Sequence, residues 1–390
     1  MLYNPLDILP KYLWKHIVSC LTYIDISKLT LLNRQFDKII DDDNWKTLFV
    51  ENRCYDIAIV KCMSSRMIGF WKHAVVNNIG CDTINKLLQF IVDDNTSDYF
   101  IYYKIFIKPG EYLFTNSDHT NYVLNKKPCS IEINGSKIAR TTIKYYNCNV
   151  QVDPFSWRRI DIAISKYFSI KHIKLDDLEL IFGKYDLCMN WFPSDDDFVK
   201  TYDKVELFIF DCIFNGGSSR LTINQINETN IDKCQFDNVF GIIIHTPNAY
   251  DEYNHKISEK IQKYNLEIFC KYCISNSVFT VGETCVYSEW LSGATIYFIN
   301  NIINGATYVF AYITDDDTHL VVNNNFVNNV KSFLKMCSNI TLDNNYFANV
   351  EKLDDDDSTD IVLNDNNIFD NCGERCMEQA AQLKIENVTS

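Results

Sequence analysis

The sequence predicts a mainly β protein, a parallel β-helix preceded by a small α-helical module. Three observations predict this fold. Apolar residues recur at helical spacing in the first 50 residues, and short β-type runs recur every 20 to 24 residues between 296 and 372. Glycine (12) and proline (7) are scarce in a chain of 390 residues, which argues against a protein built on tight hairpins.

The first helical module occupies residues 1–50. Leu9-Pro10 opens a helix, and Leu13, Ile17 and Leu21 follow at steps of four, which places one apolar stripe along it. Two further short segments carry apolar positions at Ile26, Leu29, Leu32, Phe36, Trp45 and Leu48. Three such short helices bury little apolar surface by themselves. We therefore expect the module to be covered by a partner protein or, alternatively, to cap the larger domain.

The next segment, residues 51–95, is expected to continue as helices. Ile84, Leu87, Leu88 and Ile91 would lie on one face of an amphipathic helix within it. This segment would link the first module to the β region and cap the N-terminal end of that region.

The repeat is clearest near the C-terminus, where units begin at Ile296, Leu320, Ile340 and Ile361, at steps of 24, 20 and 21 residues. Weaker copies lie at 205–215, 231–239 and 266–276. Two short β runs per unit suit one turn of a parallel β-helix, in which equivalent residues stack one turn apart. A leucine-rich repeat of similar length would need a regular leucine framework, which these units lack.

Asparagine is the second mark of the repeat. Runs such as 323–325 and 343–345 follow the first β run of each unit. Asparagine tolerates the left-handed backbone conformation at a turn, and stacked asparagine side chains can form a hydrogen-bonded ladder. We expect the β-helix to span residues 96–375, with a loose tail at 376–390.

A strand, a Pro109-Gly110 turn and a second strand are expected over 105–114, and an alternating run follows at 129–135. This arrangement resembles the opening turns of pectin-lyase-like β-helices. The resemblance implies a right-handed solenoid.

The N-terminal helices resemble an F-box over residues 9–48. The Leu-Pro opening, the apolar steps, the Asn33-Arg34-x-Phe36 turn and the closing Trp45 occur in the family's order. The resemblance implies that these helices bind the adaptor Skp1 and, through it, a cullin that carries the ubiquitin-transfer machinery. The residues it places on the Skp1-binding face are Leu9, Pro10, Leu13, Ile17, Leu21, Ile26, Leu29, Leu32, Phe36, Trp45 and Leu48.

An F-box followed by a β-helix resembles the β-helix class of animal F-box proteins and the F-box proteins of giant DNA viruses. The excess of asparagine, isoleucine and aspartate favours the viral group. The resemblance implies a non-catalytic substrate-recognition subunit of an SCF-type ubiquitin ligase. Such a subunit would act in the host cytoplasm or nucleus, need no cofactor, and be monomeric outside the ligase complex. The β-helix would bind an unidentified target protein. The alternative interpretation is a carbohydrate-binding or carbohydrate-cleaving β-helix whose N-terminal helices only cap it.

Charge and hydropathy exclude several classes. With 51 acidic and 37 basic residues, the net charge of −14 argues against nucleic-acid binding. The sequence contains no run of 18 apolar residues, so we expect no membrane span. The first residues lack the basic and then apolar pattern of a secretory signal. In the reducing intracellular environment that this predicts, the 15 cysteines are expected to be free thiols, mostly packed inside.

The candidates for catalysis or metal binding are few. Acidic runs at 195–197, 315–317 and 354–357 could supply catalytic carboxylates or bind calcium, but each lies between β runs, where solvated loops are expected. Gly-His-Gly and Arg-x-Lys, which mark polygalacturonases, are absent. Cys270-x-x-Cys273 and Cys372-x-x-x-Cys376 could form a zinc site, although 99 residues separate the two pairs. We expect neither an enzyme nor a metal site.

Overall fold

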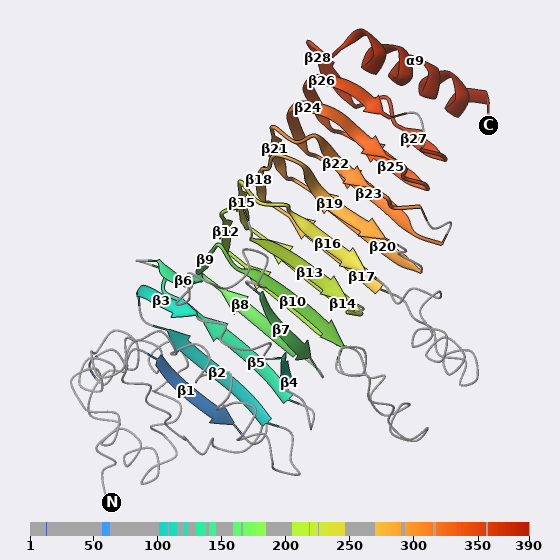
Figure 1. The fold of residues 1–390 in the computed structure, drawn as a ribbon. Coiled ribbons are helices and arrows are strands. Elements are labelled where there is room, and N and C mark those ends of the chain that lie inside the picture. Colours follow the sequence, from blue (N-terminus) through green and yellow to red (C-terminus); the bar gives the residue numbers. More distant parts are fainter. Residues whose placement is uncertain are drawn as a thin grey trace, which may run out of the picture.

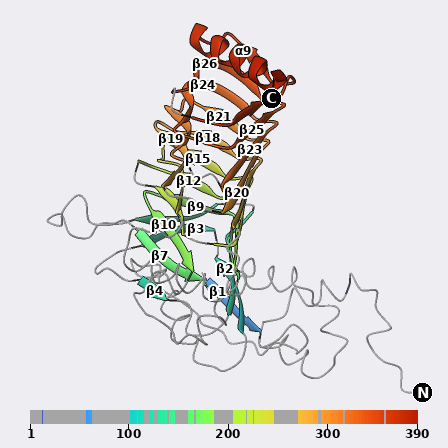
Figure 2. The ribbon, with the colours of Figure 1, turned by 90° about the vertical axis from the view of Figure 1, so that its right-hand side faces the viewer.

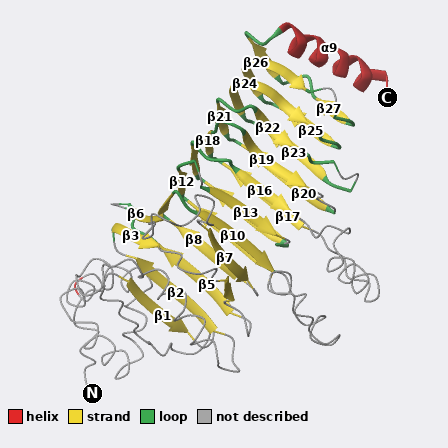
Figure 3. Ribbon diagram, in the orientation of Figure 1, coloured by secondary structure: helices red, strands yellow, loops and turns green. Residues whose placement is uncertain are grey.

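The computed structural model shows a parallel β-solenoid with a helix at its C-terminal end (Figure 1). It describes Leu13, residues 57–62 and most of 101–389. The longer gaps in that last range are 115–120, 124–128, 146–158, 185–204 and 246–269, and shorter gaps lie between them. Strands make up most of the described residues (Figure 3).

Every turn of the solenoid except the last crosses three rows of strands, which we call rows A, B and C. Row A is an eleven-stranded sheet. Its strands are β1 (Ile57–Cys62), β2 (Ile101–Ile107), β5 (Cys129–Asn134), β8 (Tyr167–Lys171), β11 (Glu206–Phe210), β14 (Glu228–Asp232), β17 (Cys270–Ser275), β20 (Ala294–Ile299), β23 (His319–Asn323), β25 (Ile340–Asp343) and β27 (Ile361–Leu363). β1 pairs antiparallel with β2, and the neighbours from β2 to β27 pair in parallel, which gives ten successive turns.

Rows B and C belong to one seventeen-stranded sheet. Row B comprises β3 (Gly110–Phe114), β6 (Thr141–Tyr145), β9 (Ile173–Asp176), β12 (Ile213–Asn215), β15 (Gln235–Asp237), β18 (Val278–Thr280), β21 (Ile302–Asn304), β24 (Phe326–Lys335), β26 (Tyr346–Asp354) and β28 (Ile368–Asp370). Row C comprises β4 (Asn121–Val123), β7 (Arg159–Ile164), β10 (Glu179–Lys184), β13 (Arg220–Asn224), β16 (Ile242–His245), β19 (Thr284–Glu289) and β22 (Tyr308–Ala311). The C-terminal halves of β24 and β26 continue row C.

The repeat predicted near the C-terminus is confirmed in its register. Ile296 pairs with Leu320, Leu320 with Ile340, and Ile340 with Ile361, so the four predicted starts stack at one position of row A. The strand–Pro-Gly–strand arrangement at 105–114 is also present, as β2 and β3. Equivalent residues therefore lie one turn apart, as the spacing required.

The interior is filled by alternate residues of each strand, because successive side chains point to opposite faces. In row B the buried rings of Phe214, Phe236 and Phe279 stack almost parallel, with centroids 4.8 and 4.7 Å apart. This distance equals the usual spacing of hydrogen-bonded strands. The hydrophobic core thus repeats from turn to turn along the solenoid axis.

Two expectations about the ends of the solenoid are wrong. Residues 57–62, expected to be helical, form β1, whose β-branched Ile57, Ile59 and Val60 favour a strand that pairs with the edge of β2. Residues 376–390, expected to be a loose tail, lie mostly in α9 (Glu374–Thr389). This helix packs on β26 and β27 and lies across the end of the solenoid (Figure 2). It buries Cys376 and Ala380, as a terminal cap of a solenoid must.

Candidate interaction surface

Five outward-facing apolar side chains lie in one line along row B. The register pairs Val278 with Ile302, Ile302 with Phe326, Phe326 with Tyr346, and Tyr346 with Ile368. Ile302, Phe326 and Ile368 are 48%, 41% and 55% exposed, whereas Val278 and Tyr346 are half-buried. We call these five residues the apolar ridge.

The ridge is narrow because row B is short. In β21, Ile302 and Asn304 point outward while Ile303 is buried, so two outward columns make up this face of the solenoid. The rings of Phe326 and Tyr346 stack on each other, 5.5 Å between centroids, so each ring covers one face of the other. The ridge therefore offers apolar edges more than open ring faces.

A buried asparagine ladder forms the corner between rows A and B. The backbone N–H of Asn301 donates to Oδ1 of Asn325 (2.8 Å), that of Asn325 to Asn345 (3.0 Å), and that of Asn345 to Asn367 (2.9 Å). Each Nδ2 also donates to a carbonyl of the preceding turn, as Asn325 does to Phe298 at 2.8 Å. The ladder expected from the sequence is confirmed, and it satisfies polar atoms that are cut off from water.

The residue before each ladder position takes the left-handed conformation that turns the chain. The φ angles of Asn300, Asn324 and Asn344 are 57°, 57° and 53°. The side chains of these three residues are exposed along one border of the ridge. Asparagine suits this position because its side chain tolerates the left-handed region at little cost.

A second, exposed ladder forms the corner between rows B and C. Asn329, Asn349 and Asn371 are also left-handed, with φ of 55°, 51° and 50°. Nδ2 of Asn349 donates to Oδ1 of Asn328 (2.8 Å), and Nδ2 of Asn371 donates to Oδ1 of Asn349 (2.6 Å). Asparagine amides therefore border the ridge on both sides.

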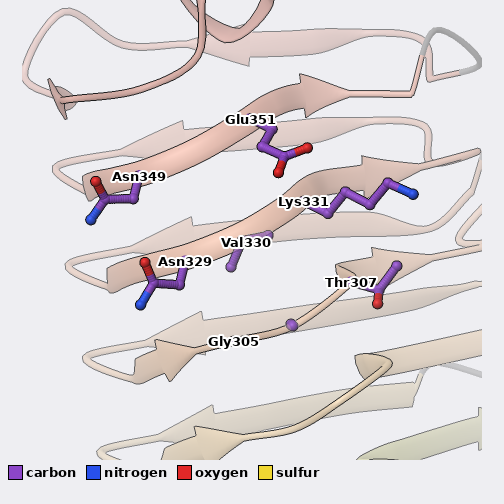
Figure 4. A pocket seen from close by; sticks show the side chains of 8 residues that line it. Gly305, Thr307, Asn329, Val330, Lys331, Asn349 and Glu351 are labelled. Atoms are coloured by element: carbon purple, nitrogen blue, oxygen red, sulfur yellow. The ribbon is translucent and has the colours of Figure 1, made fainter.

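A shallow depression of about 390 Å³ lies beside this second ladder, over β24 and β26. Its lining includes Thr307, Asn329, Lys331, Asn349 and Glu351, whose side chains Figure 4 shows. Val330 pairs with Val350, which makes Lys331 and Glu351 neighbours across the two strands. The depression therefore combines amides with one charge of each sign.

Acidic groups predominate around the last turns of the ridge. Asp343 ends β25 and Asp370 ends β28, next to the last turns of the ridge, whereas the charge of Glu351 is matched by the neighbouring Lys331. The hydroxyl of Tyr346 donates to Asp370 at 2.7 Å, and this hydrogen bond raises the pKa of the tyrosine. The surroundings of the ridge would favour a basic partner.

The acidic runs singled out in the sequence all connect row C to row A. Residues 195–197, 315–316 and 356–357 lie outside the described residues. Asp354 is buried and accepts hydrogen bonds from the hydroxyl and the backbone N–H of Ser358. Lys352 donates to Asp355 at 2.7 Å and lowers the pKa of that carboxyl. These two carboxylates hold the connection in place.

The sequence analysis did not predict two clusters of polar side chains. Nδ1 of His172 lies 2.8 Å from Oδ2 of Asp211, whose carbonyl accepts a hydrogen bond from Arg140 at 3.0 Å. In row C, Arg220 pairs with the buried Glu179. Because their members are 32 to 71 residues apart in sequence, only the stacking of turns brings them together. Each cluster braces neighbouring turns of the solenoid.

Of the residues predicted to bind Skp1, the structure describes Leu13 alone, which is helical and 36% exposed. The other ten lie outside the described residues. They are Leu9, Pro10, Ile17, Leu21, Ile26, Leu29, Leu32, Phe36, Trp45 and Leu48.

The two cysteine pairs lie on different turns. Cys270 begins β17, whereas Cys372 follows β28, four turns further along row A. The eight cysteines whose side chains the structure describes are free thiols, and six of them are buried. Burial raises the pKa of Cys337 and of Cys376 to about 12, which keeps both protonated. Among the described residues, no three His, Cys, Asp or Glu side chains lie together as a metal site would require.

Within the described part of the chain, no helix has both the length and the apolar character needed to cross a membrane. No family model, no curated protein and no solved structure matches this chain.

Proposed function

We propose that the protein is a substrate-recognition subunit of an SCF-type ubiquitin ligase. Its first 50 residues would bind Skp1 as an F-box, and its solenoid would bind the protein to be ubiquitinated. In this proposal the solenoid is right-handed and pectin-lyase-like, and a giant virus uses the protein inside the host cell to redirect host ubiquitination.

The N-terminal part of the proposal rests on the ordered F-box pattern of residues 9–48. A module this small carries more apolar positions than it can bury within itself, which favours burial against a partner. Leu13, on the first apolar stripe, is helical and partly exposed. These properties suit a residue that packs against Skp1.

The observation that carries the target-binding part is the apolar ridge. It places five apolar side chains of consecutive turns on one outer face, bordered by amides. An exposed apolar strip with a polar rim is typical of a protein-binding surface.

Co-expression with Skp1 and cullin tests the proposal. The full chain is expected to co-purify with both proteins, and the double variant Leu13→Asp, Ile17→Asp is expected to lose them, because two carboxylates would be buried in the interface. The matched control is Phe326→Lys, which changes the ridge and should retain Skp1.

An unchanged association of the double variant with Skp1 would refute the F-box assignment, provided that its solenoid unfolds at the same urea concentration as the unmodified chain. Cleavage of polygalacturonate by the purified chain, lost when Asp355 is changed to Asn, would support the carbohydrate interpretation instead. That outcome would show that the N-terminal helices only cap the solenoid.

A further inference from the structure

We infer that the apolar ridge binds an amphipathic α-helix of the partner, lying along the solenoid axis with basic residues beside its apolar stripe. This inference rests on the proposed function, since it names the structural class of the target segment.

The spacing of the ridge distinguishes a helix from a strand. Neighbouring turns are about 4.8 Å apart, so the four steps from Val278 to Ile368 span about 19 Å. A helix repeats one face about every 5.4 Å and covers four steps in about 22 Å. A strand repeats one face about every 6.8 Å and needs about 27 Å for the same four steps. Over the four steps a helix therefore deviates from the ridge by about 2.4 Å and a strand by about 8 Å, so a helix follows the ridge more closely.

The width of the ridge also favours a helix over a strand. From β21 onward, each ridge turn in row B presents one apolar residue and one neighbouring outward position, such as Ile302 with Asn304, before the chain turns at a left-handed residue. This strip is narrower than a second sheet but suits one apolar stripe of a helix. The amides of Asn324 and Asn328 would face polar residues that flank that stripe.

The exposed area argues against a second copy as the occupant. The five side chains expose on the order of 300 Å² of apolar surface, whereas each partner of a standard interface buries roughly 800 Å² of surface in total. A single helix is the smaller occupant and is therefore favoured.

The charge around the ridge selects the kind of helix. Asp343 and Asp370 lie beside the last turns, the charge of Glu351 is matched by the neighbouring Lys331, and the whole chain carries a net charge of −14. Lysine or arginine flanking the apolar stripe would complement this field and speed association, whereas glutamate would be repelled.

Three synthetic peptides of equal length test the inference by fluorescence polarisation with the full chain. The first is a helical peptide with leucines on one face and lysines beside them. The second has the same composition with leucine at alternate positions, and the third replaces lysine by glutamate. The first is expected to bind saturably, to weaken as salt rises, and to bind at least ten-fold tighter than the other two.

The ridge is tested with Phe326→Lys and, at its C-terminal end, Ile368→Lys. Each should weaken binding of the first peptide at least ten-fold, by removing an apolar contact and adding a like charge. The matched control is Val362→Lys, because Val362 is 44% exposed, close to the 41% of Phe326, but lies in row A. Urea unfolding of each variant shows whether its solenoid is intact, and two ridge positions keep the test valid if one variant fails to fold.

The inference is overturned if the helical peptide does not bind, if the alternating peptide binds as tightly, or if Val362→Lys weakens binding as much as the ridge variants. A chain that is dimeric in sedimentation and becomes monomeric with Phe326→Lys would identify a second copy as the occupant and also overturn it. Retained Skp1 binding together with no peptide binding would refute this inference alone. Lost Skp1 association with intact peptide binding would refute only the F-box assignment.

Discussion

The corner between rows A and B differs between the middle and the last turns of the solenoid. In the middle turns, Cys212 and Cys234 fill the inward position, and their thiols lie 3.6 and 3.7 Å from carbonyl oxygens of the preceding turn. In the last turns, Asn301, Asn325 and Asn345 take the same position and form the buried ladder. One backbone geometry thus accepts two side-chain chemistries.

Ser277 lies between these two regions and explains the transition. Its hydroxyl accepts the backbone N–H of Cys234 at 3.0 Å and donates to the carbonyl of Ser275 at 2.8 Å. Its own N–H donates to Oδ1 of Asn301. A thiol makes only weak hydrogen bonds and contributes mainly packing, whereas each amide joins three neighbouring groups. We therefore expect the last turns to depend more strongly on single corner residues.

The largest effect is expected from Asn325→Leu. Oδ1 of Asn325 accepts the N–H of Asn301 at 2.8 Å, and its Nδ2 donates to Phe298 at 2.8 Å and to Asn345 at 3.0 Å. Leucine leaves these buried groups without partners, which should lower the free energy of unfolding by about 3 kcal/mol or more. Equilibrium urea unfolding measures this change. A loss below about 1 kcal/mol would show that the buried ladder is not a main source of stability.

A smaller effect is expected from Cys234→Ala in the middle turns. The thiol of Cys234, which is 1% exposed, contributes packing and two weak hydrogen bonds, so its removal should cost about 1 to 2 kcal/mol. Cys234→Ser should cost less than the alanine variant, because Ser277 shows that a hydroxyl fits this corner one turn away. If Cys234→Ala cost as much as Asn325→Leu in the same urea assay, the proposed difference between the two regions would be wrong.

The smallest effect is expected from Asn349→Gly in the exposed ladder. The φ of Asn349 is 51°, which glycine adopts freely, and its hydrogen bonds to Asn328 and Asn371 are exposed to water. The cost should therefore stay below about 1 kcal/mol. The same urea assay provides the comparison with Asn325→Leu. If Asn349→Gly lowered the free energy of unfolding more than Asn325→Leu does, the place of an asparagine at a corner would matter more for stability than its burial.

The repeat units were predictable because parallel stacking makes distant residues equivalent. Ile296, Leu320, Ile340 and Ile361 share a position in the pattern and also pair in the structure. The copy at 266–276 shows where the pattern becomes ambiguous. Its Cys273 pairs with Asn230 inside a row A strand, and Ser277 instead follows Cys212 and Cys234 at the corner. Without several strong units on either side, a similar sequence does not determine the register.

The ends of the solenoid were not predictable from the same reasoning. β1 and α9 were expected as helix and loose tail, respectively, because neither carries the repeat. A terminal segment adopts whatever structure covers the exposed edge of the last turn, so its conformation depends on that edge more than on its own pattern. The clusters around Asp211 and Glu179 were missed for a related reason, because their members meet only through stacking.

The amino-acid sequence by itself determined the period of the solenoid, the inward face of its strands and the asparagine ladder, because each depends on spacing within one unit and repeats in the next. The tertiary structure alone decided which aligned positions face outward and how far they are exposed. Ile302 and Phe326 follow the starts of their units by six residues and Ile368 by seven, but their exposures of 48%, 41% and 55% arise only in the folded chain. Side chains on an outer face are constrained by neighbours from other turns, and those neighbours exist only once the chain has folded.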